Sequence, residues 1–129
     1  MRTPVNPTDA VAVGPYSSAV VGAGLLFCSG QTPLDPSTGD LVTGGVEHQT
    51  RQCFANLLAV LAAAGLDADD VVKVNVYLTD MDDFAAMNLA YAEHFEEPFP
   101  ARTTIGVAAL PLGASVEIEL VAEMHRSPT

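Results

Sequence analysis

Alternating apolar and polar residues near the end of the chain predict two β-strands separated by a turn. In the first strand, the alternation puts Arg102 and Thr104 on the same face. In the second, which follows a turn at residues 111–113, Glu117 and Glu119 share one face and apolar side chains occupy the other. The pattern therefore predicts a strand pair with one apolar face and one face that carries the charged side chains.

Earlier in the chain, the pattern predicts a hairpin followed by alternating helices and strands. The Gly-Ala-Gly stretch at residues 22–24 is typical of a hairpin turn, Gly65 is typical of a helix end, and Asp80 or Asp82 is expected to cap the second helix. The expected strands are 16–21, 25–31, 71–78, 101–107 and 116–123, and the expected helices are 46–64 and a segment ending near Glu96. This order predicts one α+β domain, residues 1–129, with two helices packed on one face of a mostly antiparallel sheet.

The chain is strongly acidic, with a formal net charge of −11 over 129 residues. Such a charge repels nucleic-acid backbones and anionic membrane surfaces, and no apolar run reaches the ~18 residues of a membrane-spanning helix. Because the sequence also shows no basic-then-apolar leader, we expect a cytoplasmic protein without nucleic-acid or membrane partners. Its mean hydropathy of +0.28 is high for so acidic a chain, which suggests apolar surface covered in an oligomer.

Familiar phosphate, nucleophile and metal motifs are absent from the sequence. The glycine-rich hairpin is not a phosphate-binding loop, because Phe27 occupies the third glycine position of Gly-x-Gly-x-x-Gly and a strand follows. Cys28 and Cys53 form no Cys-x-x-Cys pair, so we interpret both as buried thiols and expect no metal. Ser29 lies beside Gly30 at a strand end, either as a small polar exit residue or as part of a site; the Gly-x-Ser-x-Gly pattern of a nucleophilic serine is missing.

Two polar residues occupy unusual positions. Arg102 is one of only five Lys and Arg residues and lies among small and β-branched neighbours. A guanidinium on a strand can hold a carboxylate through two parallel hydrogen bonds, so Arg102 is a candidate anion-binding residue; the alternative is a charge on a sheet face that meets water. Asn88 falls within the apolar stripe of the second helix, so it either bonds a strand backbone or reaches a pocket.

Several short motifs occur in an order that covers nearly the whole chain. They are Gly14-Pro15-Tyr16, Ser29-Gly30-Gln31, Gln49-Thr50-Arg51, Asn56-Leu57, Val72-Lys73-Val74, Phe84, Asn88, Tyr91, Phe95, Pro100-Ala101-Arg102 and Glu117-Ile118-Glu119. In this order they resemble the Rid/YjgF family, and within it the RidA branch of reactive intermediate deaminases. The resemblance implies a chorismate-mutase-like fold and a homotrimer whose sheets line a central barrel, with small clefts between subunits.

The resemblance also implies an activity and a site. RidA proteins hydrolyse 2-aminoacrylate, 2-iminopropanoate and 2-iminobutanoate to 2-oxo acids and ammonia, without a metal or cofactor. By position, Arg102 would bind the carboxylate of the imino, enamino or 2-oxo acid, and Glu117 would position or activate the attacking water. Thr104 stands where relatives often have Cys, so no thiol-dependent mechanism is expected here. The other matching positions of the intersubunit cleft are Tyr16, Ser29, Gly30 and Asn88.

Two further expectations concern the glutamates and the alternatives to a deaminase. Glu119 lies close to Glu117 on the same strand face, which is expected to raise the proton affinity of one of them. A non-catalytic trimer that binds small metabolites is one alternative, although the presence of both Arg102 and Glu117 argues against it. An endoribonuclease is another, and the net charge of −11 makes it the weaker of the two.

Overall fold

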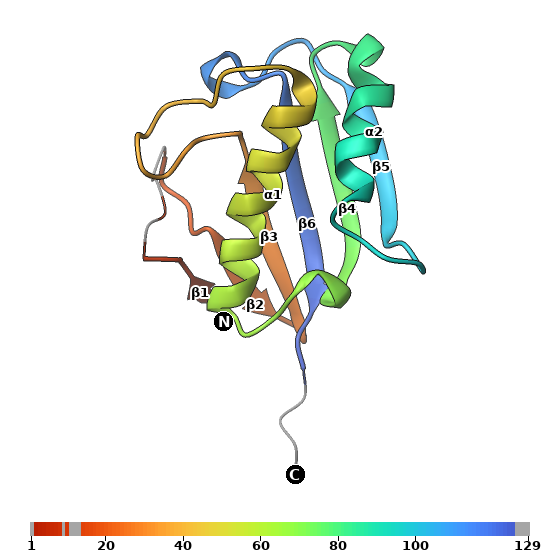
Figure 1. Cartoon of the computed structure of the whole chain (residues 1–129). Coiled ribbons are helices and arrows are strands. Elements are labelled where there is room, and N and C mark those ends of the chain that lie inside the picture. Colours follow the sequence, from red (N-terminus) through yellow and green to blue (C-terminus); the bar gives the residue numbers. More distant parts are fainter. Residues whose placement is uncertain (1, 9, 11–13, 126–129) are drawn as a thin grey trace.

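The computed structural model describes residues 2–8, 10 and 14–125, and these form one six-stranded sheet with two helices on one of its faces (Figure 1). The strand order is β1-β2-β3-β6-β4-β5, and every neighbouring pair is antiparallel except β4 and β5. The elements are β1 (Thr3–Val5), β2 (Ala19–Gly22), β3 (Leu25–Gln31), α1 (Val46–Ala63), β4 (Val71–Leu78), α2 (Phe84–Ala92), β5 (Ala101–Gly106) and β6 (Val116–Glu123). The predicted α+β class and mostly antiparallel sheet are confirmed.

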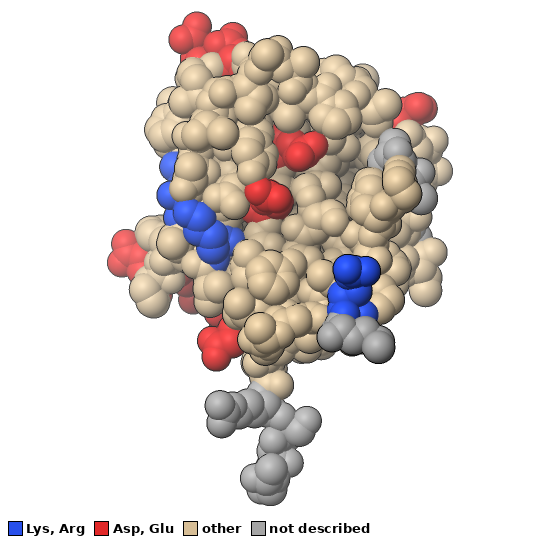
Figure 2. Space-filling model, turned by 180° about the vertical axis from the view of Figure 1, so that it is seen from behind, with Lys and Arg blue, Asp and Glu red and all other residues tan. Residues whose placement is uncertain are grey.

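The core lies between the helices and the sheet face that they cover. Side chains from α1 and α2 pack there against alternate residues of the central strands, as expected for a sheet buried on one face. The largest fully buried members are Phe54, Leu26, Leu57, Leu61, Leu78, Met87 and Ile118. Figure 2 shows the opposite face of the molecule, where mostly uncharged residues surround a few acidic side chains near the middle.

The two C-terminal strands do not form the predicted pair, because β4 lies between β5 and β6. The register also places their charged residues on opposite faces. Arg102 pairs with Val74, which is fully buried beneath the helices, whereas Glu119 pairs with Asn75 on the other face. The prediction of one shared charged face was therefore wrong. Alternation reveals which residues of one strand share a face, but the match between strands depends on register and order.

Several predicted boundaries also differ from the structure. The first strand of the hairpin begins at Ala19 rather than Tyr16, because the Tyr16 N–H bonds the Gly14 carbonyl in a tight turn, 3.0 Å away. The short strand β1 was not predicted. A 3-10 turn, Met81–Asp83, precedes α2, and Asp80 caps that turn through the Asp82 N–H. The helix α2 then ends at Ala92, four residues before the predicted end.

No helix within residues 2–8, 10 and 14–125 is both long and apolar enough to cross a membrane.

Candidate functional site

Arg102 lies on the edge strand β5, and its side chain is directed to the helix side of the sheet. Its guanidinium carbon is 4.6 Å from the centre of the Tyr91 ring and 5.6 Å from the centre of the Phe84 ring. Among the described residues, no carboxylate lies within ion-pair distance of Arg102. Its N–H donors are therefore available for an anionic ligand, in the bidentate geometry that a guanidinium offers to carboxylates.

A shallow hollow lies beside Arg102, at the junction of α2 and β5. It is lined by Asn88, Tyr91, Ala92, Phe99, Pro100 and Arg102. Of the two expectations for Asn88, the structure favours the pocket, because Asn88 lines this hollow and its Oδ1 is buried without a hydrogen-bond partner among the described residues. Its contact with a ligand stays a prediction.

Two other buried oxygens near Arg102 have no hydrogen-bond partner in the described part of the chain, namely Tyr91 OH and Thr104 Oγ1. Tyr91 lies one helical turn after Asn88, and Thr104 shares the Arg102 face of β5. A buried polar atom without a partner costs about 1–3 kcal/mol, so native structures rarely leave several together. Such a group is typical of a site that is completed by a ligand, by water or by another chain.

Glu117 lies on the opposite face of the sheet, together with Glu119. Burial raises the pKa of the Glu117 carboxyl, and the nearby Glu119 charge raises it further. Glu119 accepts hydrogen bonds from the Tyr77 hydroxyl and, at 3.3 Å, from Asn75 Nδ2. The expected direction of the pKa change is confirmed for Glu117, although burial contributes more than the neighbouring carboxylate.

Gly30 provides the space that the Glu117 carboxylate occupies. A Cβ atom at position 30 would lie 2.5 Å from Glu117 Oε2, which is closer than Cβ contacts in folded proteins. Gly30 lies within the register shift between Cys28 and Gln31, where β3 leaves its regular pairing with β6. The structure thus brings Gly30 and Glu117 together.

Ser29 and Tyr16 lie outside both the hollow beside Arg102 and the contact between Gly30 and Glu117. The Ser29 Oγ donates a 2.7 Å hydrogen bond to the Ser17 carbonyl, which ties the strand end to the preceding segment. Tyr16 is 51% exposed and lines a separate hollow next to α1 with Ser18 and Gln31. Neither residue contributes to the hollow beside Arg102.

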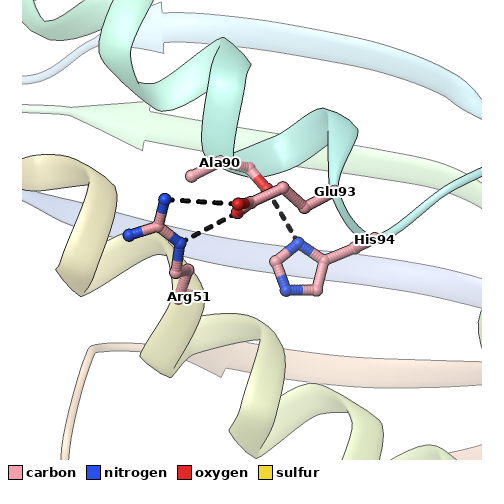
Figure 3. A network of polar contacts seen from close by, with 4 residues as sticks. All are labelled: Arg51, Ala90, Glu93 and His94. Atoms are coloured by element: carbon pink, nitrogen blue, oxygen red, sulfur yellow. Dashed lines mark hydrogen bonds and ion pairs between the residues drawn. The ribbon is translucent and has the colours of Figure 1, made fainter.

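The polar network in Figure 3 holds the C-terminal end of α2 against α1. Arg51 Nε donates to Glu93 Oε2 at 2.8 Å, and a second contact from Arg51 to Glu93 Oε1 measures 3.3 Å. The His94 Nδ1 lies 2.9 Å from the Ala90 carbonyl oxygen, and its ring stacks on Phe54 with the ring centres 4.3 Å apart. This network fixes the end of the helix that carries Tyr91.

The two cysteines are confirmed as buried free thiols. Burial raises the pKa of Cys28 to about 12 and raises that of Cys53 as well, so both stay protonated. Within the described ranges, no group of three or more His, Cys, Asp or Glu side chains is arranged to hold a metal ion.

The single chain therefore gathers five of the seven predicted site residues into two sets on opposite faces of the sheet, and Tyr16 and Ser29 belong to neither set. Arg102, Asn88 and Thr104 form one set, and Glu117 and Gly30 form the other. In the sequence, Tyr91 is among the residues that carry the family resemblance but has no predicted role in the site, and its contact with Arg102 was missed. Its spacing of three residues from Asn88 was the available signal, but the docking of α2 against β5 is a tertiary feature.

Comparison with known proteins gives a family match and close relatives. The family model described as Endoribonuclease L-PSP matches residues 7–124. A mouse protein named 2-iminobutanoate/2-iminopropanoate deaminase is 46% identical over 123 residues, covering 95% of this chain and 91% of the mouse protein. The fission yeast protein named mmf1, mitochondrial, is 44% identical over 124 residues, covering 94% of this chain and 75% of its own length.

Solved structures superpose on nearly the whole chain. RidA from the Antarctic bacterium Psychrobacter sp. PAMC 21119 has a TM-score of 0.90 and 43% identity, covering 95% of this chain and 100% of its own. E. coli TdcF, solved with bound serine, has a TM-score of 0.89 and 35% identity, covering 95% of this chain and 99% of its own.

Proposed function

Because this chain belongs to the Endoribonuclease L-PSP family, also called the YjgF/Rid family, we propose that it is an imine deaminase. Its substrates are 2-iminopropanoate and 2-iminobutanoate, with enamine tautomers such as 2-aminoacrylate. Water converts these to pyruvate or 2-oxobutanoate and ammonia. The deaminase name of the mouse relative supports the reaction class. The name of mmf1 states no activity, so the proposed substrates rest on the mouse relative and on the site, and not on family membership alone.

The observation that carries the proposal is that the Arg102 guanidinium is held in place but has no ion-pair partner among the described residues. It rests on an aromatic ring at 4.6 Å. A charge-assisted hydrogen bond contributes about 1.5–3 kcal/mol, so a bidentate contact can select substrates that carry a carboxylate. The serine bound to TdcF, a relative of the same fold, is a small molecule with such a group.

The position of Glu117 supports a site shared between two copies of the chain. Arg102 and Glu117 face opposite sides of one sheet, so one chain cannot present both to a small substrate. Apolar residues on the glutamate side of the sheet are also exposed in the single chain, including Phe27 at 43% and Ile105 at 45%. We propose the homotrimer that the family resemblance implied, with Arg102 of one copy and Glu117 of the next in each cleft.

In the proposed mechanism, Arg102 binds the substrate carboxylate and so holds the imine carbon at a fixed distance from Glu117. Glu117 accepts a proton from water while the water oxygen bonds to that carbon, and it passes this proton to the nitrogen to give a carbinolamine. Glu117 then takes the remaining hydroxyl proton and delivers it to the nitrogen, so that the C=O bond forms as the C–N bond breaks and ammonia leaves. The raised pKa of Glu117 suits this exchange, because a carboxyl that titrates closer to neutral pH can both accept and give a proton. An imine is already electrophilic, so the reaction uses only water and residues of the chain.

Tyr16, Ser29, Asn88 and Thr104 are proposed to line the same cleft. Asn88 and Thr104 would act through the buried oxygens beside Arg102, and Ser29 would act beside Gly30 on the Glu117 side. Tyr16 is half-exposed and free to contact a neighbouring copy.

The family description also names an endoribonuclease, and we do not propose that activity for this chain. The net charge of −11 opposes the electrostatic attraction on which RNA binding depends. The cytoplasmic location also stays a prediction, since one relative is described as mitochondrial.

A coupled assay tests the proposed reaction. An L-amino acid oxidase generates 2-iminopropanoate from L-alanine, semicarbazide traps the imine, and an imine deaminase slows semicarbazone formation. We expect slowing by the wild-type protein, loss of slowing with Arg102→Ala, and unchanged slowing with Lys73→Ala. The Lys73 control removes a cation from the adjacent strand on the other face of the sheet, where it donates to Thr103 Oγ1. No slowing by a correctly assembled wild-type protein would contradict the proposal and favour a metabolite-binding role.

A further inference from the structure

The contact between Arg102 and Tyr91 points to a second residue on which anion binding depends. The guanidinium carbon lies 4.6 Å from the ring centre, and Tyr91 is only 6% exposed. We propose that Tyr91 is a positioning residue, whose ring holds the Arg102 guanidinium in the orientation that binds a substrate carboxylate. This inference rests on the proposed role of Arg102.

The ring of Tyr91 is itself held on two sides. Phe54 meets it edge-on with the centres 5.6 Å apart, and Phe95 packs at 5.1 Å. The ion pair between Arg51 and Glu93, two residues after Tyr91, ties this end of α2 to α1 (Figure 3). A flexible arginine side chain on an edge strand thus rests on a ring that the core keeps in place.

An aromatic ring beside a guanidinium differs from a carboxylate in that it leaves the N–H donors available for a ligand. A carboxylate beside Arg102 would occupy its N–H groups, whereas the face of a ring attracts the cation and leaves those donors free. Burial raises the pKa of Tyr91, so the phenol stays neutral and does not compete as an anion. Phe84, at 5.6 Å and 37% exposed, is a more distant second ring. The arrangement combines a fixed guanidinium with unoccupied donors.

Binding of 2-oxobutanoate, measured by calorimetry, tests this inference without depending on turnover. We expect Tyr91→Leu to weaken binding about tenfold, a factor that corresponds to about 1.4 kcal/mol. Tyr91→Phe, which keeps the ring, should stay within about twofold of wild type. Phe95→Leu is the comparison variant: it removes a ring that packs against Tyr91 but lies outside the cation–π contacts of Arg102, so it should weaken binding clearly less than Tyr91→Leu does. In turnover, the effect of Tyr91→Leu should appear mainly in KM, since the carboxylate contact is present before and during the reaction.

A second series keeps the test decisive if Tyr91→Leu fails to fold. Replacing Tyr91 with phenylalanines that carry one, two or three fluorines preserves the ring shape while weakening the negative face that attracts the cation. A stepwise loss of 2-oxobutanoate binding supports the inference, because a purely structural ring would not produce it. Equal binding along the series, or an equal loss in Phe95→Leu and Tyr91→Leu, overturns it.

The outcomes also separate this inference from the proposed reaction. If the wild-type protein binds 2-oxobutanoate through Arg102 but hydrolyses no imine, the proposed reaction fails while the Tyr91 series remains a valid test. If the wild-type protein binds no 2-oxobutanoate, the role of Arg102 as a carboxylate ligand fails and the inference fails with it.

Discussion

A subunit-mixing experiment tests the proposal that Arg102 and Glu117 act from different copies of the chain. The strand β4 separates β5 from β6, so the two backbones lie about 10 Å apart at ~4.8 Å per strand spacing. Their side chains point away from each other across the sheet, which adds to this separation. A small imino acid cannot contact both residues of one chain.

The perturbation uses two variants that are each expected to be inactive, Arg102→Ala and Glu117→Gln. When they are unfolded together, refolded and assembled at random, half of the clefts receive an intact arginine and half of those receive an intact glutamate. About one quarter of the wild-type activity should therefore return in a closed ring of identical interfaces. The semicarbazone assay measures the recovery, and native mass spectrometry confirms that hybrid oligomers have formed.

The control replaces the Glu117→Gln partner with the double variant, which cannot supply an intact arginine. That mixture should stay inactive. If hybrid oligomers form and the first mixture also stays inactive, the shared cleft is refuted, because a site within one chain gives no complementation.

Three further predictions concern Gly30, the Glu117 carboxyl and the ion pair between Arg51 and Glu93. Gly30→Ala should lower activity more than about tenfold with little loss of stability, because the added Cβ displaces the flexible end of the Glu117 side chain. Gly22→Ala is the control: no atom lies within 4 Å of its Cβ, so activity and melting temperature should both stay unchanged. Glu117→Gln should raise the free energy of unfolding at pH 7, because burial penalises the charged carboxylate there. This gain should disappear as the pH falls through the raised pKa of Glu117 toward the ordinary value of 4.5. Urea unfolding of both proteins at the two ends of this pH range checks the sign. A double-mutant cycle on Arg51 and Glu93, whose side chains are 48% and 49% exposed, should give a coupling of about 0.2–1 kcal/mol, and a value several times larger would contradict the surface ion pair as described.

Local pattern was sufficient for the elements whose residues repeat with a clear period. The predicted strands 25–31, 71–78 and 116–123 coincide with β3, β4 and β6, and the predicted helix 46–64 differs from α1 by one residue. A helix or strand that is buried on one face needs apolar residues at the helical or strand spacing. This spacing is visible in the sequence without knowing which elements pack against that face. The end of α2 and the short strand β1 carry no comparable signal.

The family resemblance also allowed the candidate site to be listed from the sequence, since it depends on residue types in order. Arg102, Asn88 and Glu117 are candidates on this basis, without any information on their surroundings. Two of them meet around one hollow, and the third lies with Gly30 on the other side of the sheet. The order of residue types in the sequence indicates which chemical groups a site can use, but it does not give the distances between them.

The tertiary structure alone decided which candidates share a face. Strand β6 is inserted between β3 and β4, and the resulting register directs Arg102 toward Tyr91 and Glu117 toward the uncovered face. Strand order and register depend on contacts between residues far apart in the chain. They are set by the summed energies of many side-chain pairs, which no local pattern contains. The alternation of polar and apolar residues specifies each strand by itself, and only the packing of α2 against β5 determines that the arginine lies over an aromatic ring.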